Sequence, residues 1–170
     1  PILMTRRDAG EAWTGLAFGA ASHGTLAYCT IEYASYYGGT AAVRGDGYWP
    51  AVEHCTIRNN SYGALLSGIT GAALSVNNVF QNNAVNGIYC LSSPGVQIAN
   101  QTLTGHTSPS GAIRIVDCNN FRIGAGNTIT GNTWAVTMDF TSYPDAASVG
   151  NIPATGNINN DGLNCEGGTT

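Results

Sequence analysis

The stretch GNTITGN, residues 126–132, carries the pattern that decides the fold of this chain, because the pattern returns elsewhere. NVFQNN at 78–83 and IPATGN at 152–157 also place an apolar residue a few positions before Asn or Gly. A chain that keeps returning to the same short strand and the same turn residues is expected to be built from structural repeats.

Two columns of residues recur with nearly the same period. Short strands led by Gly or Ala begin at residues 15, 41, 63, 87, 111, 135 and 162, which are 26, 22, 24, 24, 24 and 27 residues apart. A second, apolar column advances by 23 to 26 residues and consists of Ile31, Ile57, Phe80, Leu103, Ile129 and Ala154. Because both columns keep one period, we expect a repeat architecture with about seven coils.

The local pattern selects the kind of repeat. Apolar residues alternate over three or four positions and are then interrupted by Gly, Asn or Ser, which is typical of short strands. No stretch keeps a helical periodicity, and propeller blades need a longer repeat of roughly 40 residues. The sequence therefore predicts an all-β fold, a right-handed parallel β-helix whose coils stack along one axis.

In this fold the apolar residue of each repeat points inward and packs on its equivalent one coil away. The Asn and Gly that follow are expected to form a corner, since both tolerate positive φ and Asn side chains hydrogen-bond along a stack. Four such corners are marked by Asn60, Asn83, Asn132 and Asn157.

Composition narrows the function classes. The chain has 170 residues, a net charge of -4 and no lysine, so nucleic acid is not an expected partner. No apolar run approaches the roughly 20 residues of a transmembrane helix. There is no CxxC motif or Cys/His cluster, so we expect no metal site and no cofactor. The first residues, PILMT, suggest that 1–170 is one β-helix domain and a segment of a longer polypeptide.

The stretch from Trp13 to Ala34, together with HCTIRNNSYGALL at 54–66, resembles the β-helix repeats of bacterial and archaeal surface proteins in the pectate-lyase-like superfamily. The resemblance covers roughly residues 13–165. It implies the fold and not the function, because that superfamily includes polysaccharide lyases, glycoside hydrolases, tailspikes, adhesins and surface-layer components.

The cysteines and the N-glycosylation sequons indicate the cellular compartment in which the protein is expected. Cys29 and Cys55 each precede a column Ile by two residues, so they should stack on adjacent coils, within reach of a disulfide. Two buried free thiols are the alternative, and the sequence leaves both open. Asn59 and Asn100 begin N-glycosylation sequons. These features favour an extracellular or cell-surface protein.

One candidate site combines an aromatic ring, an arginine and a carboxylate. Aligning the repeats makes Tyr89 and Arg114 outward neighbours, with Asp139 one diagonal away. This set could hold a sugar acid or take part in its cleavage, and the alternative is a surface ion pair beside a tyrosine. Lyases of this fold need a calcium-binding carboxylate cluster, and no paired or alternating Asp motif occurs in the chain.

Aromatic residues gather in a second candidate, the stretch YASYYGGT and the residues after it. Its possible ligand-binding residues are Tyr36, Tyr37, Tyr48 and Trp49, since exposed aromatic rings are common at interfaces and on sugar platforms. The alternative is a lid over the core. Between them lies RGD at 44–46, either an adhesive motif or a corner, and Glu32 and Arg58 are expected to form a stacked ion pair.

Taken together, the sequence favours a structural scaffold at the cell surface over an enzyme. Expected partners are further copies of the chain, stacked end to end into a filament, or other surface proteins of an adhesin, because strand edges pair with other chains unless they are covered. The alternative function is a carbohydrate-active enzyme or a sugar-binding module.

Overall fold

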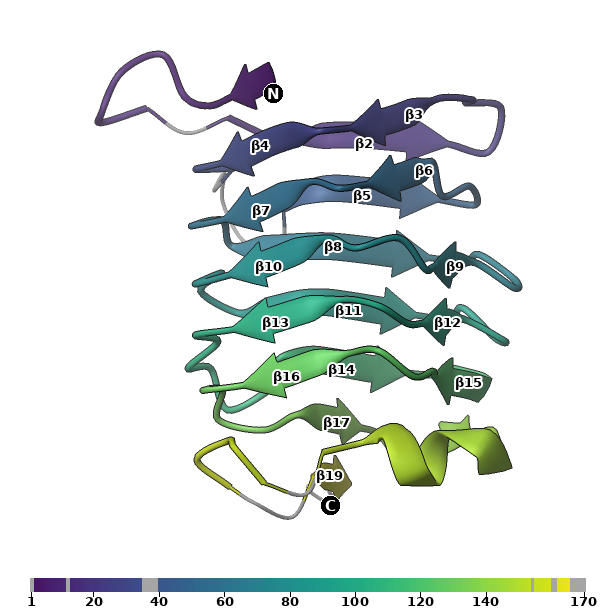
Figure 1. Ribbon diagram of the computed structural model, residues 1–170. Coiled ribbons are helices and arrows are strands. Elements are labelled where there is room, and N and C mark those ends of the chain that lie inside the picture. Colours follow the sequence, from purple (N-terminus) through teal and green to yellow (C-terminus); the bar gives the residue numbers. More distant parts are fainter. Residues whose placement is uncertain (1, 12, 35–39, 154, 160–161, 166–170) are drawn as a thin grey trace.

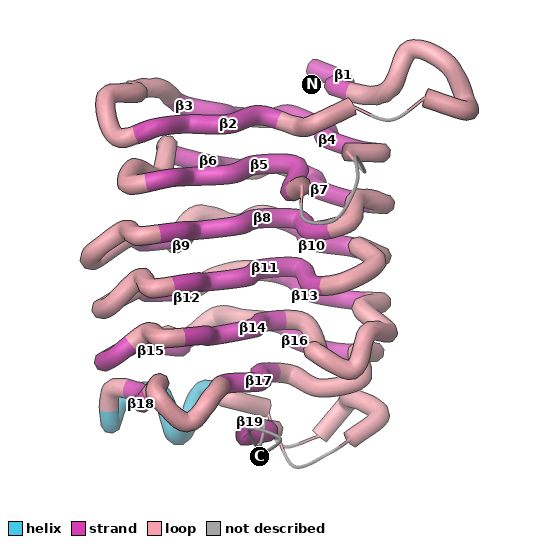
Figure 2. The backbone as a smooth tube through the Cα atoms, turned by 180° about the vertical axis from the view of Figure 1, so that it is seen from behind, coloured by secondary structure: helices cyan, strands magenta, loops and turns pink. Residues whose placement is uncertain are grey.

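The coils of the chain stack in one column. The computed structural model describes residues 2–11, 13–34, 40–153, 155–159 and 162–165. Its strands form four sheets in which every ladder pairing is parallel, as the sequence predicted for a β-helix. Figures 1 and 2 show the same column from opposite sides, with one sheet facing the viewer in each.

A six-stranded sheet forms the face that is nearer in Figure 1. Its strands, in spatial order, are β1 (Ile2–Met4), β4 (Cys29–Glu32), β7 (Thr56–Arg58), β10 (Val79–Gln81), β13 (Thr102–Thr104) and β16 (Thr128–Thr130). The predicted apolar column is in register from Ile31 to Ile129, and these residues are almost completely buried. Ala154, the sixth expected member, lies outside the described residues.

A seven-stranded sheet lies on the opposite side of the core. Its strands are β2 (Leu16–Gly19), β5 (Ala41–Asp46), β8 (Tyr62–Ser67), β11 (Asn86–Leu91), β14 (Ile113–Val116), β17 (Val136–Met138) and β19 (Leu163–Cys165). These strands come from the seven predicted repeats that begin with Gly or Ala, and with the six strands of the opposite sheet they make about six turns. Its inward residues, such as Ile88 and Ile113, pack across the core.

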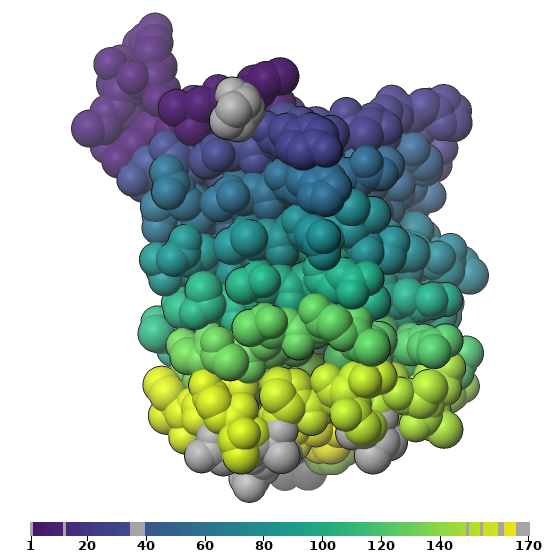
Figure 3. Space-filling model, viewed as in Figure 1, coloured from purple at the N-terminus to yellow at the C-terminus, as the bar shows by residue number. Residues whose placement is uncertain are grey.

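Shorter strands close each coil. A four-stranded sheet contains β9 (Ala73–Leu74), β12 (Gln97–Ile98), β15 (Asn119–Ile123) and β18 (Tyr143–Pro144), and β3 (Thr25–Ala27) pairs with β6 (Ala51–Glu53). After β18 the chain forms the 3-10 helix η1 (Ala146–Asn151), which Asp145 caps by accepting the N–H of Ala147. In the space-filling view the coils form continuous layers, and the first residues project from one end (Figure 3).

At each corner that Asn marks, two neighbouring residues have different structural roles. Asn59, Asn82, Gly105, Gly131 and Gly156 have positive φ and turn the chain, whereas the following residue enters the interior. The following residues form a hydrogen-bonded column, which we call the Asn ladder: Asn60, Asn83, His106, Asn132 and Asn157. Within it each Asn accepts a backbone N–H of the preceding coil and donates to a carbonyl of that coil.

His106 is the one described rung of the Asn ladder that is not asparagine, and its side chain is fully buried. Its ring nitrogens lie 3.2 Å from the carbonyl oxygens of Asn83 and of Phe80. A neutral imidazole has a single N–H, so one of these contacts sets a lone pair against a carbonyl oxygen. Burial lowers the pKa of His106, although both carbonyls act in the opposite direction. The folded protein therefore favours the neutral ring.

We expect His106 to make folding stability depend on pH. Below the ordinary histidine pKa of about 6.5, the unfolded chain binds a proton that the folded chain binds less readily. Stability is then lost as the pH falls from about 6.5 toward the lower folded pKa, by up to about 1.4 kcal/mol per pH unit. Urea unfolding at about pH 7.5 and about pH 5.5 measures this loss, and His106→Asn should remove most of it.

His23 offers the matched control, because its side chain is exposed and the ladder does not contain it. His23→Asn should leave the pH dependence as it is in the unchanged protein. If His106→Asn and the unchanged protein lose the same stability over this pH interval, His106 is not the titrating group.

Candidate functional site

The predicted pairing of Tyr89 with Arg114 is present on the outer face of the seven-stranded sheet. The two residues are in register on β11 and β14, and the guanidinium carbon of Arg114 lies 5.8 Å from the centre of the Tyr89 ring. Tyr62 stacks on Tyr89 at 5.8 Å between ring centres. Arg114 also donates to Ser110 Oγ (2.8 Å). Tyr62 and Arg114 thus flank the Tyr89 ring along the axis, which leaves less of its faces available as a sugar platform.

Asp139, the third member of this candidate site, contributes to a corner. Its carboxylate accepts hydrogen bonds from Ser142 Oγ (2.6 Å), Thr141 Oγ1 (2.7 Å) and the backbone N–H of Asp117 (3.2 Å). Partial burial would raise the pKa of Asp139, but the bonds from Ser142, Thr141 and the backbone together lower it below its ordinary value. A carboxylate that is held ionised by three donors is poorly suited to act as a general acid near neutral pH.

A groove of about 520 Å³ lies where the chain leaves β5, and it contains two of the predicted aromatic residues. Tyr48 and Trp49 line it together with Pro50 and the turn between β8 and β9. Tyr48 also makes an edge contact with His23, with 5.6 Å between ring centres. Trp49 is only 9% exposed and packs into the core. Tyr48 is therefore the aromatic side chain of this groove that a ligand could reach. Tyr36 and Tyr37 lie outside the described residues.

The RGD tripeptide is part of strand β5 and does not form a corner. Arg44 and Asp46 project from the same side of the strand, and Arg44 Nε donates to Asp46 Oδ2 at 2.7 Å. Gly45 between them is buried, and a Cβ there would lie 2.3 Å from the carbonyl oxygen of Tyr48. Position 45 therefore requires glycine, because the backbone of Tyr48, which lines the groove, passes close to it.

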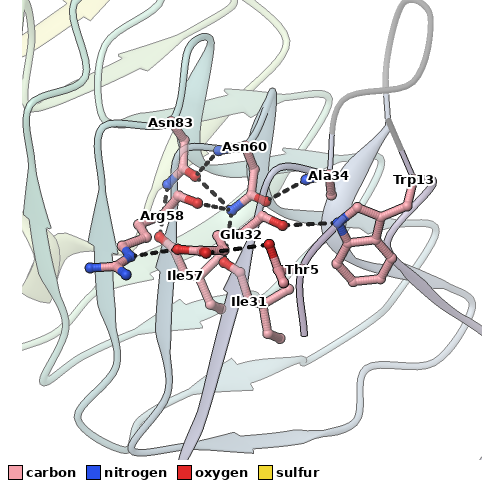
Figure 4. A network of polar contacts seen from close by, with 9 residues as sticks. All are labelled: Thr5, Trp13, Ile31, Glu32, Ala34, Ile57, Arg58, Asn60 and Asn83. Atoms are coloured by element: carbon pink, nitrogen blue, oxygen red, sulfur yellow. Dashed lines mark hydrogen bonds and ion pairs between the residues drawn. The ribbon is translucent and has the colours of Figure 1, made fainter. Parts of the chain in front are cut away.

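The expected ion pair between Glu32 and Arg58 is confirmed and belongs to a wider network (Figure 4). The two residues are in register on β4 and β7, and Arg58 Nε donates to Glu32 Oε2 at 2.9 Å. Thr5 donates to the other carboxylate oxygen, and Trp13 Nε1 donates to the Glu32 carbonyl. The network ties the first residues of the chain to the second and third coils.

A comparison with known protein families matches residues 5–103, more than half of the chain, to the family described as right-handed β-helix region. The chain belongs to this right-handed β-helix family. Comparison with curated proteins and with solved structures gives no match. Family membership confirms the predicted fold and its hand, and it leaves the biochemical function open. Among the described residues no helix is long and apolar enough to cross a membrane.

The β-helix stacks Cys29 on Cys55 as expected, but the disulfide is absent and both are free thiols. Cys29 donates to its own coil, at Ala27 O (3.3 Å), and Cys55 to Glu53 O (3.3 Å). The backbone N–H of Cys29 donates to Cys55 Sγ (3.4 Å). The thiols serve as rungs of a second ladder that continues through Asn78, Gln101 and Asn127.

Both sequons of the β-helix lie at corners of the coils. Asn59 is half-buried and Asn100 is exposed, and both have positive φ. The amide of Asn100 donates to Ser75 O at 3.1 Å. Their modification stays a prediction, and Asn100 is the more accessible of the two.

Three features of this β-helix were not predicted from the sequence. His106 and Gln101 were not recognised as ladder rungs, because neither is Asn, although each follows the period of its column. Tyr62 was not linked to Tyr89, although the spacing of 24 residues between the repeats would have aligned their strands. The hollow beside the Arg122 groove was not predicted, because η1, which contributes to it, has no counterpart in the other described coils.

Proposed function

We propose that this right-handed β-helix is a structural scaffold of an extracellular or cell-surface protein, and that it extends by stacking end to end on a second copy. The observation behind this proposal is that polar side chains of the types found in catalytic or binding sites contact other residues of the β-helix and hold neighbouring coils together. Asp139 accepts hydrogen bonds at a corner, Arg114 stacks on Tyr89, and Glu32 forms an ion pair between the first coils.

At the end of the column that contains β1, an exposed strand edge supports the proposed stacking. No described strand pairs with the outer edge of β1. Ile2 N donates to Tyr28 O, so Ile2 bonds toward β4, and by the alternation of a parallel ladder the N–H and C=O of Leu3 face outward. Ile2 and Leu3 are 62% and 59% exposed. An apolar edge strand with free backbone groups is a template for another strand.

At the opposite end, β16 and β19 are the last strands of their sheets among the described residues. A second copy placed there would continue both sheets, because its β1 and β2 belong to the same two sheets. Extracellular location is supported by the sequons at Asn59 and Asn100, and surface proteolysis of intact cells would test it.

Electron microscopy of the purified protein tests the stacking. We expect end-to-end particles with an axial repeat of roughly 33 Å, from seven coils at roughly 4.8 Å each. Leu3→Pro should shorten or abolish them, because proline removes the outward N–H without touching the bonds to β4. Leu3→Ala is the matched control, since it removes the same apolar side chain and keeps the N–H.

Single particles at every concentration, with no difference between Leu3→Pro and the unchanged protein, would contradict the stacking.

The groove beside Tyr48 favours the second candidate function, a sugar-binding module. Single particles that bind a polysaccharide, with binding lost in Tyr48→Ala, would favour that function over the scaffold.

A further inference from the structure

The arginines of the described chain differ in whether their side chains have partners. Arg7, Arg44 and Arg58 form ion pairs with carboxylates. Arg6 lies 4.2 Å above the Tyr33 ring, and Arg114 contacts Ser110 and Tyr89. Within the part of the chain that the structure describes, Arg122 is the remaining arginine, and its exposed guanidinium makes no ion pair and no ring contact.

The Arg122 side chain lines a concave surface. A groove of about 360 Å³ is formed by Arg122, Gln97, Asn100 and the backbone around Gly124. Gln97 and Arg122 are in register on β12 and β15, so an amide and a guanidinium lie side by side at its wall. The floor requires glycine, because a Cβ on Gly124 would lie 2.8 Å from the Cβ of Ala99.

The groove continues because the next coil departs from the repeat. A second hollow of about 290 Å³ shares Gly124 and Ala125 with the first and is closed by residues 150–153. Here η1 follows the short strand β18, whereas the longer β15 of the preceding coil continues to Ile123. The carboxylate nearest in the repeat, that of Asp145, accepts the N–H of Ala147 at the start of η1. It is therefore engaged in capping and forms no ion pair with Arg122 among the described residues.

We propose that Arg122, Gln97 and Asn100 form a binding site for a carboxylate group. A guanidinium presents two parallel N–H donors that match the two oxygens of a carboxylate. The Gln97 amide adds a donor beside them, and the neighbouring hollow admits the rest of the ligand. The ligand is either a small organic acid or an acidic peptide whose side chain supplies the carboxylate. The site would bind the carboxylate group in the same way in both.

The site also bears on the sequon at Asn100, which stands at the rim of the groove. A glycan on Asn100 would replace one of the two hydrogens of Nδ2, the atom that donates to Ser75 O, and would stand at the rim of the groove. We expect it to hinder entry of a carboxylate, so the binding experiment requires protein without glycan.

NMR titration with acetate tests the proposal. We expect saturable shifts of the Arg122 Nε–H signal and of the amides of residues 97–100 and 124–126. Acetamide, a neutral molecule of the same shape, should cause none. Arg122→Gln should weaken acetate binding at least tenfold, and Arg122→Lys should weaken it less, because lysine keeps the charge and loses the paired donors.

Arg7→Gln is the control, since it removes one exposed positive charge far from the groove in the chain. It should leave the acetate affinity unchanged. A peptide with the sequence acetyl-Glu-Gly-Glu-amide distinguishes the two sources: tighter binding than acetate identifies an acidic peptide, and equal binding identifies a small acid. Equal acetate shifts in Arg122→Gln and in the unchanged protein, or shifts spread over all arginines, would overturn the proposal.

Discussion

Phe80→Ala is expected to lower the free energy of unfolding by about 3–5 kcal/mol, because deleting a buried aromatic side chain leaves a cavity. Phe80 is fully buried and lies in register between Ile57 and Leu103 at the middle of the column. Its ring fills space that glycine leaves, since a Cβ on Gly63 would lie 2.7 Å from Phe80 Cδ1. Removing the ring therefore creates a cavity that the rigid coils cannot close.

The position of the cavity adds a second expected effect. Each coil of a solenoid contacts only its neighbours, so a weak interface in the middle divides the stack into two halves. Urea unfolding followed by circular dichroism should show the loss as a lower midpoint and a broader transition. Val79→Ala is the control, because Val79 is the preceding residue on β10 and is half-buried. A cost for Phe80→Ala no greater than that for Val79→Ala would contradict this account of the core.

The column containing Phe80 could be predicted from the sequence because the fold copies the repeat directly. In a parallel β-helix, residues one period apart become neighbours in space, so the spacing of Ile57, Phe80 and Leu103 already states which side chains touch. The same reasoning predicted the Glu32–Arg58 ion pair and the stacking of Arg114 on Tyr89.

Side-chain roles were harder to predict, because they depend on bonds within a coil that the period does not describe. Asp139 has the position expected for a site residue, yet Ser142 and Thr141, three and two residues further on, occupy its carboxylate. Cys29 and Cys55 are adjacent as expected, but each thiol donates to a carbonyl of its own coil. The hollow that continues the groove of Arg122 is closed by residues 150–153 at the end of η1, and the repeat carries no signal for this helix.

Asn83→Leu is expected to lower the free energy of unfolding by about 2–4 kcal/mol, although leucine is similar in size. Asn83 Oδ1 accepts from the backbone N–H and the side-chain amide of Asn60 (3.1 and 3.0 Å), and Asn83 Nδ2 donates to Ile57 O (3.1 Å). All of these groups are buried, so leucine would leave the donors of Asn60 without this acceptor in the core. The cost is that of unsatisfied polar groups and not of lost packing.

Asn82→Gly separates this effect from any general sensitivity of the corner. Asn82 precedes Asn83, is exposed and has a φ of 51°, a conformation that glycine adopts at the equivalent Gly105 and Gly131. We expect the free energy of unfolding to change by no more than about 0.5 kcal/mol, because glycine is unstrained there and no buried bond is lost. Urea unfolding of both variants at pH 7 makes the comparison. Similar losses in the two variants would show that the backbone of the corner, and not the Asn ladder, holds the coils together.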